Sequence, residues 1–430
     1  MNRSLIYIAA TLSIVNCQLS IAQQPVPAPK QSAPITIVGA TVHIGNGKLV
    51  ENAIVKFDNG KIARIESWNG SEALNDANTI NAKGKHLYPG FIALNSNLGL
   101  SEIEAVRATN DYNETGSVNP NIQSTISYNT DSKVTPTVRF NGVLLAQVTP
   151  QGGQLSGKSS VMMLDAWNWE DALYKNDVGV HLNWANMTPY KAWWIQQEEN
   201  QQEKAEKEIQ RLYAFFKEAK SYVESNSTEK NLRFEGMKAL FNGSQKLFIN
   251  ANGIKEISAS VAFCKEMGIK MVLVGGNDAW LATELLKENN IPVIVGRTHS
   301  LPNRTDEDVD LPYKLPYLLH KEGLQVALSV DGFWQQRNLP FNAGTAAAYG
   351  LSKEEALACI TSNAASILGI DKTTGTIEVG KDANLFISTG DALDMRTNNV
   401  EQAYIQGRKI ELSTVQTELY KKYLAKYNIK

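Results

Sequence analysis

Residues 247–295 read LFINANGIKEISASVAFCKEMGIKMVLVGGNDAWLATELLKENNIPVIV. Three short apolar runs in this stretch alternate with two longer segments whose apolar residues recur at helical spacing. The runs begin at residues 247, 271 and 292, and a fourth, QVALSV, begins at residue 325. Connections of this length leave room for a crossover helix, so we expect parallel strands. The stretch therefore predicts an α/β centre made of repeated strand–helix units.

Further apolar runs extend this series toward the N-terminus. Phe91–Leu94 and Val143–Val148 have the length and composition of buried strands. An eight-stranded barrel needs about 250 residues, which residues 89–374 can supply. We therefore expect a (β/α)8, TIM-like barrel, with its functional residues at the C-terminal ends of the strands.

Shorter strand-like runs separated by turn signals lie on both sides of the expected barrel. Ile35–Val38 and Ala53–Phe57 are examples from the first side. The two flanking segments, residues 34–88 and 375–412, are expected to pair into one small composite β-sandwich domain. Residues 413–430 are expected to form a C-terminal helix.

The N-terminus has the pattern of a secretory signal. Arg3 precedes the apolar run Leu5–Val15, and small residues follow at positions 20 and 22. The run is shorter than the about 20 residues that cross a bilayer, so no transmembrane segment is expected. Residues 1–22 are predicted as a signal peptide and residues 23–33 as a Pro-rich linker, which predicts a periplasmic or secreted protein.

Charge and cysteine content exclude several classes of protein. The chain has 42 Lys and Arg against 44 Asp and Glu, a balance that gives no reason to expect a nucleic-acid partner. Cys264 and Cys359 are the only cysteines beyond the signal peptide. Two distant cysteines make neither a disulfide framework nor a zinc cluster, so we expect two buried thiols.

The segment GGQLSGKS at residues 152–159 matches the phosphate-binding pattern GxxxxGK[ST]. A phosphate loop places its amides at the start of a helix, whereas Ser160–Leu164 reads as another strand. Nucleotide binding therefore ranks last among the functions. We expect a glycine-rich loop at the barrel mouth instead, with Gly152 and Gly153 next to the substrate.

Two segments at opposite ends of the expected barrel resemble the amidohydrolase superfamily. YPGFIALNSN at residues 88–97 resembles its first barrel strand, PG[FL]ID-x-H-x-H. GTIEVGKDANL at residues 375–385 resembles its closing signature, and residues 342–365 resemble its eighth helix. The nearest subgroup is the imidazolonepropionase-like hydrolases, and the resemblance covers about residues 34–412.

The resemblance implies hydrolysis of C–N bonds other than peptide bonds, with one or two divalent metals that activate water. The positions that correspond to the family's metal ligands are Asn95, Asn97, Asn250 and Asp331. Only Asp331 keeps the family's residue type, as ligand and catalytic base. Asparagine is a weak, neutral substitute for histidine on zinc, so the resemblance implies a degraded metal site.

Three further residues are candidates for substrate binding. His181 falls near the expected fourth strand, and Arg297 and His299 follow the seventh strand. Other interpretations stay open. A single inward histidine is commonly structural, and His299 can be a solvent-exposed loop residue. The asparagines can simply hydrogen-bond one another, and Asp331-Gly332 is a turn dipeptide.

These observations support two functions. In the first, an amidohydrolase scaffold without cofactor binds a small molecule at the barrel mouth, or partners an intact amidohydrolase relative or a second copy of itself. In the alternative, an active C–N hydrolase uses Asp331 with His181 or His299 in a rearranged zinc site or a metal-free site. Convergence of these three residues favours the alternative, whereas asparagines that satisfy one another favour the first function.

Overall fold

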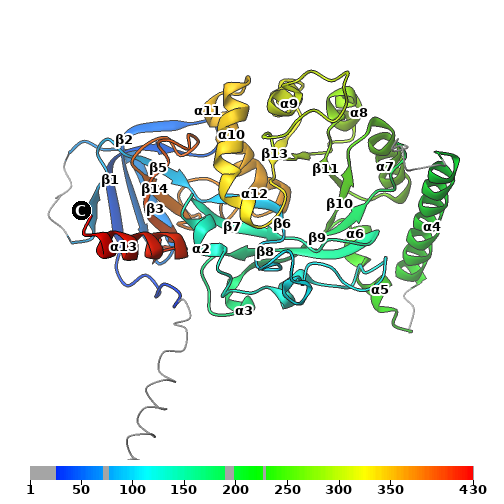
Figure 1. Ribbon diagram of the computed structural model, residues 1–430, viewed down its shortest axis with the longest axis horizontal. Coiled ribbons are helices and arrows are strands. Elements are labelled where there is room, and N and C mark those ends of the chain that lie inside the picture. The colour runs from blue at the N-terminus through cyan, green and yellow to red at the C-terminus, as the bar shows by residue number, and fades with distance from the viewer. Residues whose placement is uncertain (1–25, 71–76, 189–197, 226–228, 430) are drawn as a thin grey trace, which may run out of the picture.

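The computed structural model describes residues 26–70, 77–188, 198–225 and 229–429. The signal peptide predicted at residues 1–22 lies outside the described residues and stays a prediction. Figure 1 shows a sheet domain at one end of the molecule, a barrel in the middle and the long helix α4 (Glu198–Ser225) at the opposite end.

Eight strands form a nearly closed barrel that follows chain order. They are β6 (Phe91–Ser96), β7 (Val143–Val148), β8 (Leu155–Met163), β9 (Leu173–Asn183), β10 (Lys246–Ala251), β11 (Met271–Gly275), β12 (Val293–Val295) and β13 (Val326–Leu328). A parallel bridge from Leu94 to Ser329 connects the first strand to the segment after the eighth. This arrangement confirms a mixed α/β fold with a barrel.

One strand differs from the expected all-parallel (β/α)8 pattern. β8 runs antiparallel to both β7 and β9. The connections before and after β8 are too short for a crossover helix, so the chain reverses direction at each of them. The same strand excludes a phosphate loop, because Lys158 and Ser159 lie within it and Lys158 pairs with Asp177 at 3.2 Å.

Helices cover the outside of the parallel part of the barrel (Figure 1). They are α7 (Ile254–Met267), α8 (Thr283–Glu288), α9 (Leu311–Lys321), α10 (Leu339–Ala348), α11 (Lys353–Cys359) and α12 (Ser362–Leu368). α7 buries Ile257, Val261 and Cys264 and ends at Gly268 in the left-handed conformation. Both thiols are buried as expected, and burial raises the pKa of Cys264 and of Cys359 to about 12.

The second sheet combines strands from both ends of the chain. Its strands are β1 (Ile35–His43), β2 (Leu49–Asp58), β3 (Lys61–Ser67), β4 (Thr79–Asn81), β5 (His86–Pro89), β14 (Leu385–Ser388), β15 (Val400–Ile405) and β16 (Arg408–Ile410). β5 and β14 join the two halves as antiparallel neighbours, with Tyr88 opposite Phe386. Phe57 and Tyr404 pack edge to face in the sheet's own hydrophobic core.

Short helices occupy the connections. They are α2 (Thr135–Arg139), α3 (Trp169–Ala172), α5 (Leu232–Glu235), α6 (Lys238–Phe241) and the 3-10 helices Arg107–Thr109, Ser124–Ser127, Ala279–Leu281 and Trp334–Asn338. The final helix, α13 (Val415–Tyr427), lies beside the second sheet (Figure 1). Among the described residues, no helix combines the length and the apolar character that crossing a membrane requires.

Candidate functional site

A cavity of about 320 Å³ lies at the C-terminal ends of the parallel barrel strands. The lining includes Asn250 of β10, Arg297 in the loop after β12 and Asp331 in the loop after β13. Leu301, Leu311 and Leu315 form an apolar wall. The polar part is rich in amides, supplied by Asn95, Asn250, Asn252, Asn277 and Asn303. The cavity therefore presents neutral donors and acceptors together with one guanidinium, from Arg297, and two carboxylates, from Asp331 and Glu307.

The cavity brings together three of the four positions that the sequence resemblance assigns to metal ligands. Asn95, Asn250 and Asp331 line it, whereas Asn97 is 7% exposed and does not. The register of β6 is irregular between Ala93 and Ser96, and Asn95 has a left-handed backbone with φ of 50°. This irregularity breaks the alternation that would place Asn95 and Asn97 on the same face.

Asn250 belongs to a chain of amide hydrogen bonds. Its Nδ2 donates to Asn183 Oδ1 at 2.8 Å, and Asn183 Nδ2 donates to the carbonyl oxygen of Gly153 at 2.8 Å. The two asparagines are directly opposite each other on β10 and β9. Asn250 is thus held by the amide of Asn183, and not by Asn95 or Asn97 as the structural interpretation expected.

His181 is buried and is connected to the backbone of Asn95 through Gln147 and Ser159. The backbone N–H of Asn95 donates to Gln147 Oε1 at 3.1 Å, and Gln147 Nε2 donates to Ser159 Oγ at 2.9 Å. Ser159 Oγ is 2.8 Å from His181 Nε2, and the imidazole stacks on Phe248. Burial lowers the pKa of His181 to about 3, so the ring is neutral. His181 does not line the cavity, and it supports the backbone of Asn95 instead.

The two candidate residues after β12 lie in different surroundings. Arg297 lines the cavity, and its Nε donates to Ser300 Oγ at 3.1 Å. His299 does not line it. His299 Nε2 is 2.7 Å from Thr345 Oγ1 on α10, and partial burial lowers the pKa of the ring. His181, His299 and Asp331 therefore do not share one site.

Sequence reasoning missed Glu307 and three of the amides. The Glu307 side chain lines the cavity, is 3% exposed, and is 3.1 Å from the guanidinium of Arg304. Arg304 also pairs with the buried Asp278 at 2.8 Å, which connects the loops after β11 and β12. Asn252 and Asn277 could have been found, because they directly follow two strands at the face where barrels build sites.

The two glycines proposed for substrate binding lie away from this cavity. Gly153 lines a separate cavity of about 480 Å³ together with Asn183 and Trp184. Gly152 and Gly153 both have positive φ, and a Cβ on Gly152 would lie 2.2 Å from the Asn113 side chain. The loop needs glycine for its conformation.

The donor set does not fit the metal that the fold family implies. Asp331 is the single carboxylate among the positions that the resemblance assigns to family ligands, and the other three positions hold asparagine, whose neutral oxygen is a weak ligand for zinc. Within the described residues, no group of three or more His, Cys, Asp or Glu side chains is arranged to hold a metal ion. Zinc sites use imidazole, thiolate and carboxylate ligands, which these amides do not replace.

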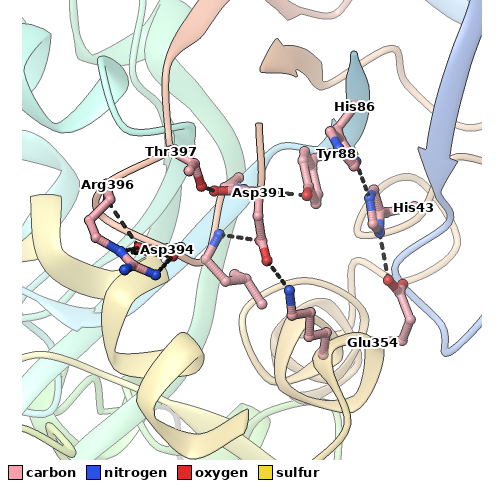
Figure 2. A network of polar contacts seen from close by, with 11 residues as sticks. His43, His86, Tyr88, Glu354, Asp391, Asp394, Arg396 and Thr397 are labelled. Atoms are coloured by element: carbon pink, nitrogen blue, oxygen red, sulfur yellow. Dashed lines mark hydrogen bonds and ion pairs between the residues drawn. The ribbon is translucent and has the colours of Figure 1, made fainter. Parts of the chain in front are cut away.

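Two other histidines form a network between the composite sheet and α11. Figure 2 shows His43 between His86 and Glu354. His43 Nδ1 is 2.5 Å from Glu354 Oε1, and its Nε2 is 3.0 Å from His86 Nδ1. His43 also stacks on Tyr88, with ring centroids 4.2 Å apart. None of these residues lines the barrel-mouth cavity. Because the two histidines belong to the sheet and Glu354 belongs to α11, the network connects the sheet to the barrel.

Comparisons with known proteins agree with this architecture. Residues 256–410 match the Amidohydrolase family. An amidohydrolase from Thermotoga maritima is similar to the chain at 24% identity, over 88% of this chain and 99% of that one, with a TM-score of 0.76.

Two other solved structures are more distant. A prolidase complexed with N-methylphosphonate-L-proline has 14% identity over 88% of this chain and 100% of that one, with a TM-score of 0.54. Molinate hydrolase has the same identity and TM-score over 88% of this chain and 95% of that one. No curated protein matches the chain. Residues 256–410 thus match the Amidohydrolase family model, and the chain shares its fold with solved amidohydrolases.

Proposed function

We propose that this protein binds a small polar molecule at the barrel mouth and acts as a binding or partner subunit, without the family's metal-dependent hydrolysis. The observation that carries the proposal is the amide-rich cavity at the positions of the family's metal ligands. The imidazolonepropionase-like relationship and the degraded metal site are parts of the same proposal. Export by the predicted signal peptide is a further part of the proposal.

The contacts of the candidate residues support this reading over the alternative hydrolase. A rearranged metal site would need His181 or His299 beside Asp331. Neither ring lines the cavity that holds Asp331: His181 contacts Ser159 through Nε2 and stacks on Phe248, and His299 contacts Thr345. Asp331 shares the cavity with several amides, which are hydrogen-bonding groups for a ligand.

The lining defines the chemistry of the ligand. Arg297 can bind a carboxylate with two hydrogen bonds, and Asp331 can accept from an amine or amide N–H. The neutral amides suit a peptide-like group, and the apolar wall suits a short aliphatic side chain. A volume of about 320 Å³ is at the small end of ligand pockets. We therefore expect a zwitterion or an N-acylated amino acid about the size of a dipeptide.

Metal content tests the first part of the proposal. The protein is purified without chelators and measured by elemental mass spectrometry, in parallel with Asp331→Ala. We expect no zinc, manganese or iron above background in either protein. About one equivalent of metal that is lost in Asp331→Ala would support the alternative hydrolase.

Titration calorimetry with apolar dipeptides and N-acetylated amino acids tests the second part. We expect binding that weakens about tenfold or more in Arg297→Gln, because the carboxylate loses its charged partner. Arg107→Gln, an exposed arginine away from the cavity, is the matched control. Equal binding by the two variants would contradict the assigned role of Arg297.

A further inference from the structure

The helix α13 presents an apolar stripe to solvent. None of its thirteen residues is buried. Four large apolar side chains, each 49–59% exposed, recur at every fourth position, and they are Val415, Leu419, Tyr423 and Tyr427. Side chains four residues apart share one face of a helix, so these four form a continuous row. Thr417 and Leu424, which are half-buried, lie on the opposite side and face the protein.

The aromatic end of this stripe is already ordered. The rings of Tyr423 and Tyr427 contact each other with centroids 4.7 Å apart. Exposed single apolar residues are ordinary on protein surfaces, whereas this row is a continuous apolar surface along one helix. We propose that the α13 stripe binds the α13 stripe of a second copy of this chain, with the two helices antiparallel.

The order of side-chain sizes along the stripe favours a second copy. The aliphatic residues Val415 and Leu419 occupy the N-terminal half, and the two tyrosines occupy the C-terminal half. A two-fold axis beside Lys421 places Leu419 opposite Tyr423 of the second copy. It also places Val415 opposite Tyr427 of the second copy. Each ring then meets an aliphatic side chain, whereas a parallel pair would set ring against ring.

Charges beside the stripe follow the same two-fold arrangement. Glu418 and Lys422 lie four residues apart on one flank of the stripe, and both are exposed. In the antiparallel pair, Glu418 lies near Lys422 of the second copy, and the reverse contact forms by symmetry. Within its own chain Glu418 pairs with Lys421 at 2.8 Å, an exposed contact that can rearrange.

The size of the stripe sets the strength of the association. A helix of this length is about 20 Å long and about 10 Å wide, so one of its faces has an area of about 200 Å². This area is well below the roughly 800 Å² that each partner buries in a typical stable complex. We therefore expect a weak dimer whose population rises with protein concentration.

Sedimentation velocity over a range of protein concentrations tests the proposal with the full chain. The wild type should shift from monomer to dimer as concentration rises. Leu419→Asp should weaken the dimer about tenfold or more. Leu232→Asp, at an exposed leucine of α5, should leave the dimer unchanged. Circular dichroism shows whether the helix content of each variant is kept.

A charge exchange distinguishes this pairing from any other contact. Glu418→Lys and Lys422→Glu should each weaken the dimer, and the double variant should restore it, because opposite charges again meet across the axis. A wild type that stays monomeric at every concentration would overturn the proposal. So would a dimer that Leu419→Asp leaves intact, or a monomer that sediments with phosphatidylglycerol vesicles through α13.

Discussion

The side-chain amide of Asn250 donates a hydrogen bond of 2.8 Å to the amide oxygen of Asn183 on the neighbouring strand. This bond fixes the orientation of the Asn250 amide at a position that the sequence resemblance assigns to a metal ligand. One of the two amide hydrogens of Asn250 is therefore used in a structural contact, and the other amide hydrogen and the amide oxygen are left to meet a ligand in the cavity.

We predict that Asn250→Ala lowers the free energy of unfolding by about 1 kcal/mol, because Asn183 Oδ1 loses its donor. Urea denaturation measures the change. Asn252→Ala removes an exposed amide from the same cavity lining and should change stability by less than about 0.5 kcal/mol. Equal losses in the two variants would show that the Asn250 bond contributes nothing specific.

We predict an acid-dependent loss of stability that comes from His181. Burial lowers the pKa of this ring from 6.5 to about 3, so the unfolded chain takes up a proton that the folded protein excludes. The stabilisation is complete above pH 6.5 and is lost as the pH falls toward about 3, by about 1.4 kcal/mol per pH unit. Urea denaturation at several pH values should show a shallower slope in His181→Gln.

His320→Gln is the matched control for this pH experiment. The His320 side chain is 40% exposed, beside Glu355, and should leave the slope as in the wild type. A His181→Gln variant with the wild-type slope would contradict the assignment of the acid response to His181.

We predict that Asp165→Asn is strongly destabilising. The Asp165 carboxylate is 2.7 Å from Arg139 and 2.9 Å from Arg408, and all three side chains are mostly buried. Neutralising it leaves two buried guanidinium groups without their anion, at a cost of about 3–5 kcal/mol. Thermal and urea denaturation measure this loss of stability. Asp394→Asn, which breaks an exposed pair with Arg396, should cost at most about 1 kcal/mol.

We predict that Glu354→Ala loosens the contact between the composite sheet and the barrel. His43 Nδ1 loses its carboxylate partner, which should cost about 1–3 kcal/mol. Hydrogen exchange should then increase along β1 and α11. Glu401→Ala, which breaks an exposed pair with Lys85, is the control and should leave exchange in these elements unchanged. Equal hydrogen-exchange rates in β1 and α11 of the two variants would contradict the role of His43 in joining the sheet to the barrel.

The sequence predicted the barrel because apolar runs such as Met271–Val274 have the spacing of strand–helix units. It missed the reversed direction of β8, because the length of a connection decides direction and an apolar run alone does not. At the site, the resemblance to the amidohydrolase superfamily indicated Asn95, Asn250 and Asp331, and the place of Arg297 just after a strand indicated that residue.

Other features of the site depend on three-dimensional structure. Asn97 leaves the site because of a backbone irregularity in β6, which depends on the packing of neighbouring strands. Glu307 enters it from a loop well beyond the end of β12, where no strand pattern indicates its position. Loop conformation is set by tertiary contacts such as the one between Arg304 and Asp278.

The pairing of β5 with β14 has a consequence for how the protein is made. The N-terminal half of the composite sheet is synthesised first, and β5 then has an open edge until β14 leaves the ribosome, almost 300 residues later. An open strand edge pairs readily with other chains. The growing polypeptide therefore carries an aggregation hazard throughout synthesis of the barrel, and a chain cut short before residue 385 would keep that edge permanently.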